Sequence, residues 1–141
     1  MAMTAQDLES KIKEVHALAP VAITTDTTTN GEIIDTAGWR SLTFIPYAGV
    51  VTDGTYTPAL KHSDSATMVG EVVVPDADLL PSGTGQEATA VVSATNGTSK
   101  IGYRGDKRYV TCDIVSASTS SGVAGFAVLA IQSGAVDEPI A

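Results

Sequence analysis

The chain has 141 residues and a formal net charge of −8, from 8 basic and 16 acidic residues. This length suits one domain, and the acidic balance argues against nucleic acid as a partner because a negative field repels phosphates. The single cysteine, Cys112, excludes an internal disulfide and a zinc site built from several cysteines. No apolar run has the length of a membrane span, and acidic residues interrupt the N-terminus, so we expect no membrane partner, no secretion signal and synthesis in a cytoplasm.

Charged residues form only 17% of the chain, against about 25% in an average soluble domain. Small residues and threonine take their place, which predicts a surface that loses water at little cost. Such a surface favours burial against other subunits.

Residues 6–19 (QDLESKIKEVHALA) carry a helix-like pattern that ends at Pro20. The apolar positions of this pattern are Leu8, Ile12, Val15 and Ala19. Their spacing predicts one apolar stripe on an amphipathic helix. We therefore expect an N-terminal helical arm over residues 1–20, which either lies on its own domain or docks on a neighbour through Leu8, Ile12 and Val15. If it is such an arm, removing residues 1–19 should leave the remaining domain folded.

From residue 21 onward the sequence predicts strands separated by turns. The expected strands are 21–29, 31–35, 41–51, 55–63, 68–74, 88–94, 99–104, 108–118 and 123–132. The pairs Asn30-Gly31, Asp53-Gly54 and Asn96-Gly97 are typical of hairpin turns, and Pro46 indicates an edge strand or a bulge. Short strands with frequent turns predict an all-β fold for residues 21–141, an antiparallel β-sandwich of jelly-roll or Greek-key type.

The strand expected at 123–132 is apolar on both faces. Phe126 and Val128 share one side, whereas Ala127, Leu129 and Ile131 share the other. One face of a sandwich strand meets the core, so the second face needs a helix or another subunit to cover it. We therefore place Phe126, Val128 and Leu129 in the core or in a protein interface.

The chemistry-bearing side chains form no recognisable catalytic set. His62-Ser63-Asp64 has the letters of a hydrolase triad, but neighbours on an extended chain point to opposite faces. We interpret the acidic residues of 71–87 as a solvated loop rather than a calcium site. The prediction is a protein that is not an enzyme and uses no metal or cofactor.

A basic cluster surrounds the turn at Gly105-Asp106. It consists of Lys100, Arg104, Lys107 and Arg108. These cations could contact phosphate, but in an acidic chain we expect them to pair with carboxylates across a subunit boundary.

Three segments resemble, in order and spacing, small proteins that accompany the major capsid protein of tailed bacteriophages. They are SLTFIPYAGVVTDGTYTPALKHSD (41–64), DADLL (76–80) and KIGYRGDKRYVTCDI (100–114). The resemblance implies a capsid decoration or cement protein: a β-sandwich, expected as a homotrimer, that binds the outer surface of the major capsid protein lattice in the virion and stabilises the head. The family pattern continues as R-Y-V-R-V, whereas this chain has Thr111 and Asp113 at the outward positions.

Two other functions stay open. A tail-tube or head-completion protein would form larger rings than a trimer. A carbohydrate-binding attachment module would present exposed aromatic side chains for sugar stacking, and this chain has one tryptophan, Trp39.

Overall fold

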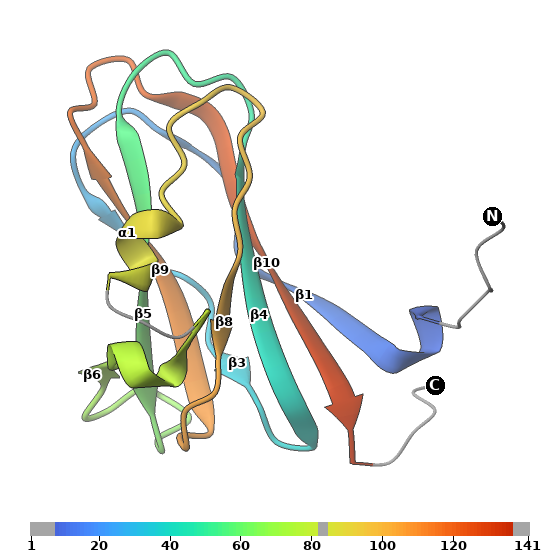
Figure 1. Ribbon diagram of the computed structural model, residues 1–141. Coiled ribbons are helices and arrows are strands. Elements are labelled where there is room, and N and C mark those ends of the chain that lie inside the picture. Colours follow the sequence, from blue (N-terminus) through green and yellow to red (C-terminus); the bar gives the residue numbers. More distant parts are fainter. Residues whose placement is uncertain (1–7, 82–84, 137–141) are drawn as a thin grey trace, which may run out of the picture.

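The computed structural model describes residues 8–81 and 85–136, which form a sandwich of two antiparallel sheets (Figure 1). Sheet A contains, in spatial order, β1 (Ile12–Ile23), β10 (Val123–Ala135), β4 (Trp39–Ala48), β8 (Ile101–Tyr103) and β7 (Leu79–Leu80). Sheet B contains β2 (Thr28–Thr29), β9 (Tyr109–Ala117), β5 (Thr55–Ser63) and β6 (Val72–Val73), and β3 (Ile34–Asp35) also pairs with β9. The described helices are single turns: η1 (Glu9–Lys11), η2 (Asp76–Asp78) and α1 (Gln86–Thr89).

Strands from the two ends of the chain alternate in each sheet. β10 lies between β1 and β4, while β9 lies between β2 and β5. This is the strand order of a jelly roll, in which the two halves of the chain pair along their length and wrap into two sheets. The predicted antiparallel β-sandwich is therefore confirmed.

The core lies between the sheets and follows the alternation of apolar residues along each long strand. In β5 the inward residues include Tyr56 and Leu60, both fully buried. In sheet A, Phe44 and Phe126 are also fully buried, and the rings of Tyr56 and Phe126 have centroids 5.2 Å apart. Aromatic contacts across the two sheets thus fill the middle of the sandwich.

The helix predicted over residues 6–19 is wrong for the part that the structure describes. Beyond the single turn η1, residues from Ile12 onward form β1, which pairs antiparallel with β10 from Ile12–Ser133 to Ile23–Val123. Pairing gives one long edge of β10 a partner and buries Ala17 and Leu18 in the core. This tertiary gain outweighs a weak helix propensity.

Because β1 belongs to sheet A, the expected domain boundary at residue 20 falls inside a strand. Removing residues 1–19 would take away Ala17 and Leu18, which are 0% and 7% exposed. The structure therefore argues against the expectation that the sandwich stays folded after this truncation. Pro20 is tolerated because β1 is an edge strand and its register with β10 is irregular between Leu18 and Val21.

The three Gly-containing pairs are not hairpin turns. Asp53-Gly54 carries the chain from β4 in sheet A to β5 in sheet B, and Asn96-Gly97 precedes β8 without a paired strand before it. Asn30-Gly31 lies between β2 and β3, which follow one another along β9. A Cβ on Gly31 would collide with the backbone carbonyl of Cys112, so glycine is needed there for a close approach of two backbones.

The prediction of an edge or bulge at Pro46 is also wrong, because β4 lies between β10 and β8. The Pro46 carbonyl accepts hydrogen bonds from the Ser99 amide at 3.0 Å and the Thr98 hydroxyl at 3.2 Å. In an antiparallel strand the nitrogen and the carbonyl of one residue point to the same side. The missing N–H therefore faces residues 98–99, beyond the end of β8, and costs no bond to β10.

Candidate interaction surface

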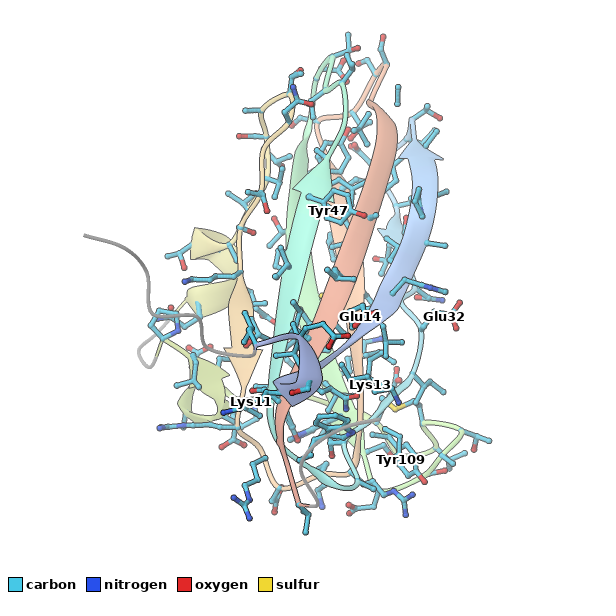
Figure 2. All side chains as sticks on the ribbon, turned by 90° about the vertical axis from the view of Figure 1, so that its right-hand side faces the viewer. Lys11, Lys13, Glu14, Glu32, Tyr47 and Tyr109 are labelled. Carbon is cyan, nitrogen blue, oxygen red and sulfur yellow. The ribbon has the colours of Figure 1, made fainter. Side chains whose placement is uncertain are left out.

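The outer face of sheet A has an apolar centre that stays partly exposed. Ile45 of β4 and Leu129 of β10 are directly paired at its centre and are both partly exposed. Tyr47, 43% exposed, lies along β4 on the same side, as Figure 2 shows. At the other margin Leu80 of β7 lies over Gly102 of β8. We call this the sheet A surface.

The sheet A surface carries little charge. The outward positions of β4 and β10 are Ser41, Thr43, Ile45, Tyr47, Ala127, Leu129, Ile131 and Ser133. None of these is charged, although the chain has 16 acidic residues. The adjoining part of β1 adds Glu14 and His16, which pair with Ile131 and Leu129. An apolar centre with a polar margin is the composition of a protein interface.

β1 also gives sheet A a long free edge. The other sheet edges in the described structure are formed by strands of two residues, whereas β1 has 12. Residues 30–32 approach β1 near its middle, where the Glu32 amide donates to the Ala17 carbonyl at 2.6 Å. The first part of β1 diverges from the body of the sandwich (Figure 1). Lys13 and Glu14 lie along it, and Lys11 ends the preceding turn η1 (Figure 2). Charged side chains on an edge oppose uncontrolled pairing with other strands.

The three residues predicted to dock the N-terminal arm have different environments. Leu8 is 64% exposed, Ile12 is partly exposed on the sheet A surface, and Val15 packs against the core of its own chain. Docking on a neighbour stays a prediction for Leu8 and Ile12. Val15 already has apolar partners within its own chain and is a poor candidate.

The residues of β10 separate in the same way. Phe126 and Val128 are 0% and 1% exposed between the sheets, so of the two places predicted for them the core is correct and an interface is excluded. Leu129 points to the other side and stays a candidate for an interface.

The basic cluster is largely satisfied within the chain. The Arg108 guanidinium binds the Asp35 carboxylate through Nε at 2.8 Å and Nη2 at 2.9 Å, and Lys107 Nζ lies 2.7 Å from an Asp64 oxygen. Arg104 Nε donates to the Ala77 carbonyl at 2.9 Å. Lys107 and Arg108 thus already have carboxylate partners within the chain and are poor candidates for ion pairs across a subunit boundary, whereas for Arg104 that pairing stays a prediction. Lys100 is exposed and has no ion-pair partner among the described residues.

The Arg108–Asp35 pair shifts both acid–base equilibria. Hydrogen bonding to Arg108 lowers the pKa of Asp35 to about 2, and the same bond raises the pKa of Arg108. Both side chains are about half exposed, at 54% and 46%, so the pair contributes little stability.

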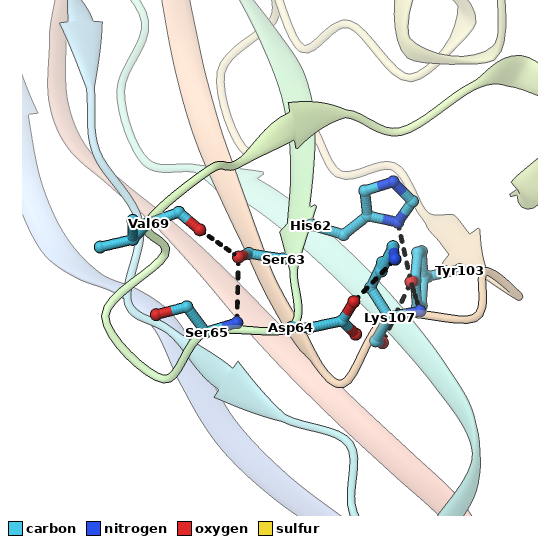
Figure 3. A network of polar contacts seen from close by, with 7 residues as sticks. All are labelled: His62, Ser63, Asp64, Ser65, Val69, Tyr103 and Lys107. Carbon is cyan, nitrogen blue, oxygen red and sulfur yellow. Dashed lines mark hydrogen bonds and ion pairs between the residues drawn. The ribbon is translucent and has the colours of Figure 1, made fainter.

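The letters His62-Ser63-Asp64 do not form a catalytic triad. His62 Nδ1 lies 2.9 Å from the Tyr103 hydroxyl, whereas the Ser63 hydroxyl donates to the Val69 carbonyl at 2.8 Å (Figure 3). Asp64 instead pairs with Lys107. The three side chains therefore have three separate partners, as the alternation along the strand predicted.

The same polar network joins the end of β5 to the turn after β8 (Figure 3). The Tyr103 hydroxyl accepts a hydrogen bond from the Lys107 amide at 3.1 Å and lies 3.2 Å from the Lys107 carbonyl. Burial raises the pKa of Tyr103, which keeps its hydroxyl protonated and able to donate. The network holds the turn at 103–107 against β5, which is a structural role.

Sheet B has a buried polar group that sequence reasoning missed. Thr111 and Asp113 face outward on β9, as expected, but are only 5% and 2% exposed. Asp113 accepts a hydrogen bond from the Gly31 amide at 2.9 Å and lies 3.2 Å from Lys61 Nζ, which also binds Glu71 at 2.9 Å. These contacts raise the pKa of Lys61, chiefly through Glu71. Polar residues on the outward side of β9 predict an exposed face, so the sequence of the strand did not indicate that distant segments bury it.

The acidic residues of the 71–87 region are dispersed. Glu71 binds Lys61, while Glu87 Oε1 accepts the Leu60 amide at 2.7 Å. Burial raises the pKa of Glu87. Within residues 8–81 and 85–136, no group of three or more His, Cys, Asp or Glu side chains has the geometry to hold a metal ion.

The helices of the described chain are too short to cross a membrane. Comparisons with protein-family models, curated proteins and solved structures found no match to this chain.

Proposed function

We propose that the chain is a structural protein of a tailed-bacteriophage virion, a capsid decoration protein that binds the outer surface of the major capsid protein lattice. The order of the segments 41–64, 76–80 and 100–114 supports this family resemblance. The observation that carries the proposal is the sheet A surface, whose apolar centre at Ile45 and Leu129 lies open to other molecules.

In the proposed assembly three copies place their sheet A surfaces toward a common axis. Covering the apolar centre provides the driving force, because apolar surface removed from water contributes roughly 25 cal/mol per Å². The surface is nearly uncharged, so three acidic chains approach each other where their repulsion is least. The exposed Leu8 and Ile12 then lie near the margin of the contact, from which they reach a neighbouring subunit.

A lattice of equivalent sites also explains how modest contacts hold a decoration protein on a shell. Each contact of a trimer is weak alone, but the second and third contacts form at a high effective concentration. No enclosed catalytic pocket is required for this role.

Mass spectrometry of purified virions of the phage that encodes this chain tests the proposal. We expect the chain in a fixed ratio to the major capsid protein, and labelling with antibody on the outside of the head. Its absence from virions, or its location in the tail alone, would contradict the proposal. In the second case the alternative of a tail-tube or head-completion protein applies.

A further inference from the structure

One lysine of sheet B lies against a carboxylate that is almost completely buried. Lys61 of β5 and Asp113 of β9 are on adjacent antiparallel strands, where Lys61 is paired with Thr111 and Asp113 with Ala59. Lys61 Nζ is 3.2 Å from Asp113 Oδ2, and Asp113 is 2% exposed. The strand pairing therefore holds an amine and a carboxyl group in contact on the same face of the sheet.

Two further groups contact the same pair of side chains. The Gly31 amide donates to Asp113 Oδ1 at 2.9 Å, so a donor points at the oxygen that gains negative charge when a nucleophile attacks Cγ. Glu71 Oε1 lies 2.9 Å from Lys61 Nζ, within reach of a proton on the amine. The site therefore combines a nucleophile, an electrophilic carbon, an oxyanion donor and a base.

A hollow on the outer side of sheet B surrounds these groups. The rest of its lining is formed by Asn30, Ile33, Met68 and Thr111. Met68 and Thr111 are 8% and 5% exposed, so the floor of the hollow has little contact with water. The side chains of Lys61 and Glu71 are 32% and 39% exposed, which leaves a way out for a small product.

We propose that Lys61 and Asp113 condense after folding into an amide bond that joins β5 to β9. Nζ attacks Cγ of Asp113, the Nζ–Cγ bond forms and the Cγ–Oδ2 bond breaks. The ammonium group gives up two protons, which Glu71 takes in turn and passes to the departing Oδ2, so that this oxygen leaves as water. One ammonium and one carboxylate thus become a neutral amide and water, and the atoms balance without a further reactant.

Proximity makes this condensation feasible. Free ammonium and carboxylate groups stay hydrated in solution, whereas groups that a fold holds in contact react with an effective molarity that can reach roughly 10⁵ M or more. Burial adds to the driving force, because the amide replaces a charged group at the buried end of the pair. Contacts with Glu71 and Asp113 raise the pKa of Lys61, so its amine is mostly protonated and the bond forms slowly, once in each chain.

The exposed pair of Lys107 and Asp64 shows what distinguishes the site. Its Nζ–Oδ2 distance is shorter, at 2.7 Å, but the Asp64 side chain is 68% exposed. Among the described residues no backbone amide donates to the Asp64 carboxylate, and no second carboxylate lies within ion-pair distance of Lys107. Close approach is therefore not sufficient by itself, and we expect this pair to stay ionic.

Mass spectrometry of the full-length protein tests the bond. After incubation of the folded protein at mildly alkaline pH, its intact mass should be lower than the mass of the sequence by one water molecule. Tryptic digestion should then yield one branched peptide in which Lys61 is joined to Asp113. Lys61→Arg keeps a cation beside the carboxylates but has no nucleophilic amine, so this variant should keep its full mass.

Glu71→Gln should slow bond formation about a hundredfold, because the variant keeps the shape of the side chain but lacks the base. Asp64→Ala is the matched control, since it removes the exposed pair alone, and it should form the bond at the natural rate. Thermal unfolding confirms that each variant folds. A natural protein that keeps its full mass after prolonged incubation would overturn the proposal. So would loss of water in Lys61→Arg, a branched peptide at Glu71 instead of Asp113, or an unchanged rate in Glu71→Gln.

Discussion

The outer face of sheet B is polar and buried, whereas the outer face of sheet A is apolar and partly exposed. On sheet B the central strand β9 carries Thr111 and Asp113 outward, and residues of the 30–33 and 64–71 segments close over them. On sheet A the central strands β4 and β10 carry Ile45 and Leu129 outward, and both side chains stay partly exposed.

The contrast follows from what each kind of surface needs. A buried carboxylate needs donors at fixed positions, and the chain itself provides them through the Gly31 amide and Lys61. An apolar face needs only a complementary surface without water, which a separate molecule can provide. The polar face is therefore completed within the fold, while the apolar face stays available for assembly.

Removing the buried carboxylate of sheet B should strongly destabilise the fold. Asp113→Ala leaves the Gly31 amide without its acceptor and removes one partner of Lys61, so we expect a loss of about 3 kcal/mol in the free energy of unfolding. Urea denaturation measures the loss. Asp64→Ala is the control, because its pair with Lys107 is exposed, and it should cost below about 1 kcal/mol. Equal losses in the two variants would show that the buried contacts of Asp113 stabilise the fold no more than the exposed Asp64–Lys107 pair does.

The close approach beneath that cover is the next target. Gly31→Ala places a methyl group against the Cys112 carbonyl and should cost about 2 kcal/mol or more, because backbone must move. Gly70→Ala in the other covering segment has open space around its Cβ but a φ of +71°. Its cost should be limited to the left-handed strain of about 1 kcal/mol. Chemical denaturation measures the unfolding free energy of both variants. A larger loss of unfolding free energy in Gly70→Ala than in Gly31→Ala would contradict the prediction.

Substitution on the sheet A surface should leave the single chain nearly as stable. Ile45→Ser removes a partly exposed side chain, so the unfolding free energy of the monomer should fall by no more than about 1 kcal/mol. Phe44→Ala, on the same strand but fully buried, should cost about 3–5 kcal/mol. Denaturation at dilute protein concentration measures both. A loss at Ile45 as large as that at Phe44 would mean that the surface is covered by its own chain.

The smallest effect belongs to the exposed pair at the edge of sheet B. The folded-state pKa of Asp35 is about 2, below its ordinary value of 3.8, so the pair adds stability above pH 3.8 that is lost as the pH falls toward 2. Arg108→Gln should raise the pKa of Asp35 toward 3.8, which NMR titration measures, and should change the unfolding free energy little because the pair is exposed to water. An unchanged pKa in the variant would show that Arg108 is not its cause.

The sequence predicted those elements whose pattern is local. β5 and most of β10 alternate apolar and polar or small residues with period two, and their burial follows that alternation. β9 has the same alternation in sequence, but both of its faces are buried from Val110 to Ile114. The resulting fold class was correct. Inward and outward sides of Tyr56, Leu60, Val110 and Ile114 were likewise readable from the chain.

Features that depend on distant partners were not predictable. β1 has a helix-like spacing of Ile12 and Val15, but its pairing partner, β10, lies more than 100 residues away. Gly31 looked like a hairpin glycine, although its role is to let two backbones approach. Lys107 and Arg108 found acceptors on loops whose positions only the tertiary structure defines. For the candidate interface residues of β10, the alternation separated Leu129 from Phe126 and Val128, but only the tertiary structure shows which of the two faces meets the core.

Light scattering of the purified chain and of Leu129→Glu tests the central claim, that the sheet A surface is completed by other copies of the chain. We predict a molar mass three times the 14.4 kDa of one chain for the natural sequence, and the mass of one chain for the variant with its fold retained. A natural protein that stays a single chain at high concentration would contradict the claim. So would a variant that keeps the trimer with a glutamate at the centre of the surface.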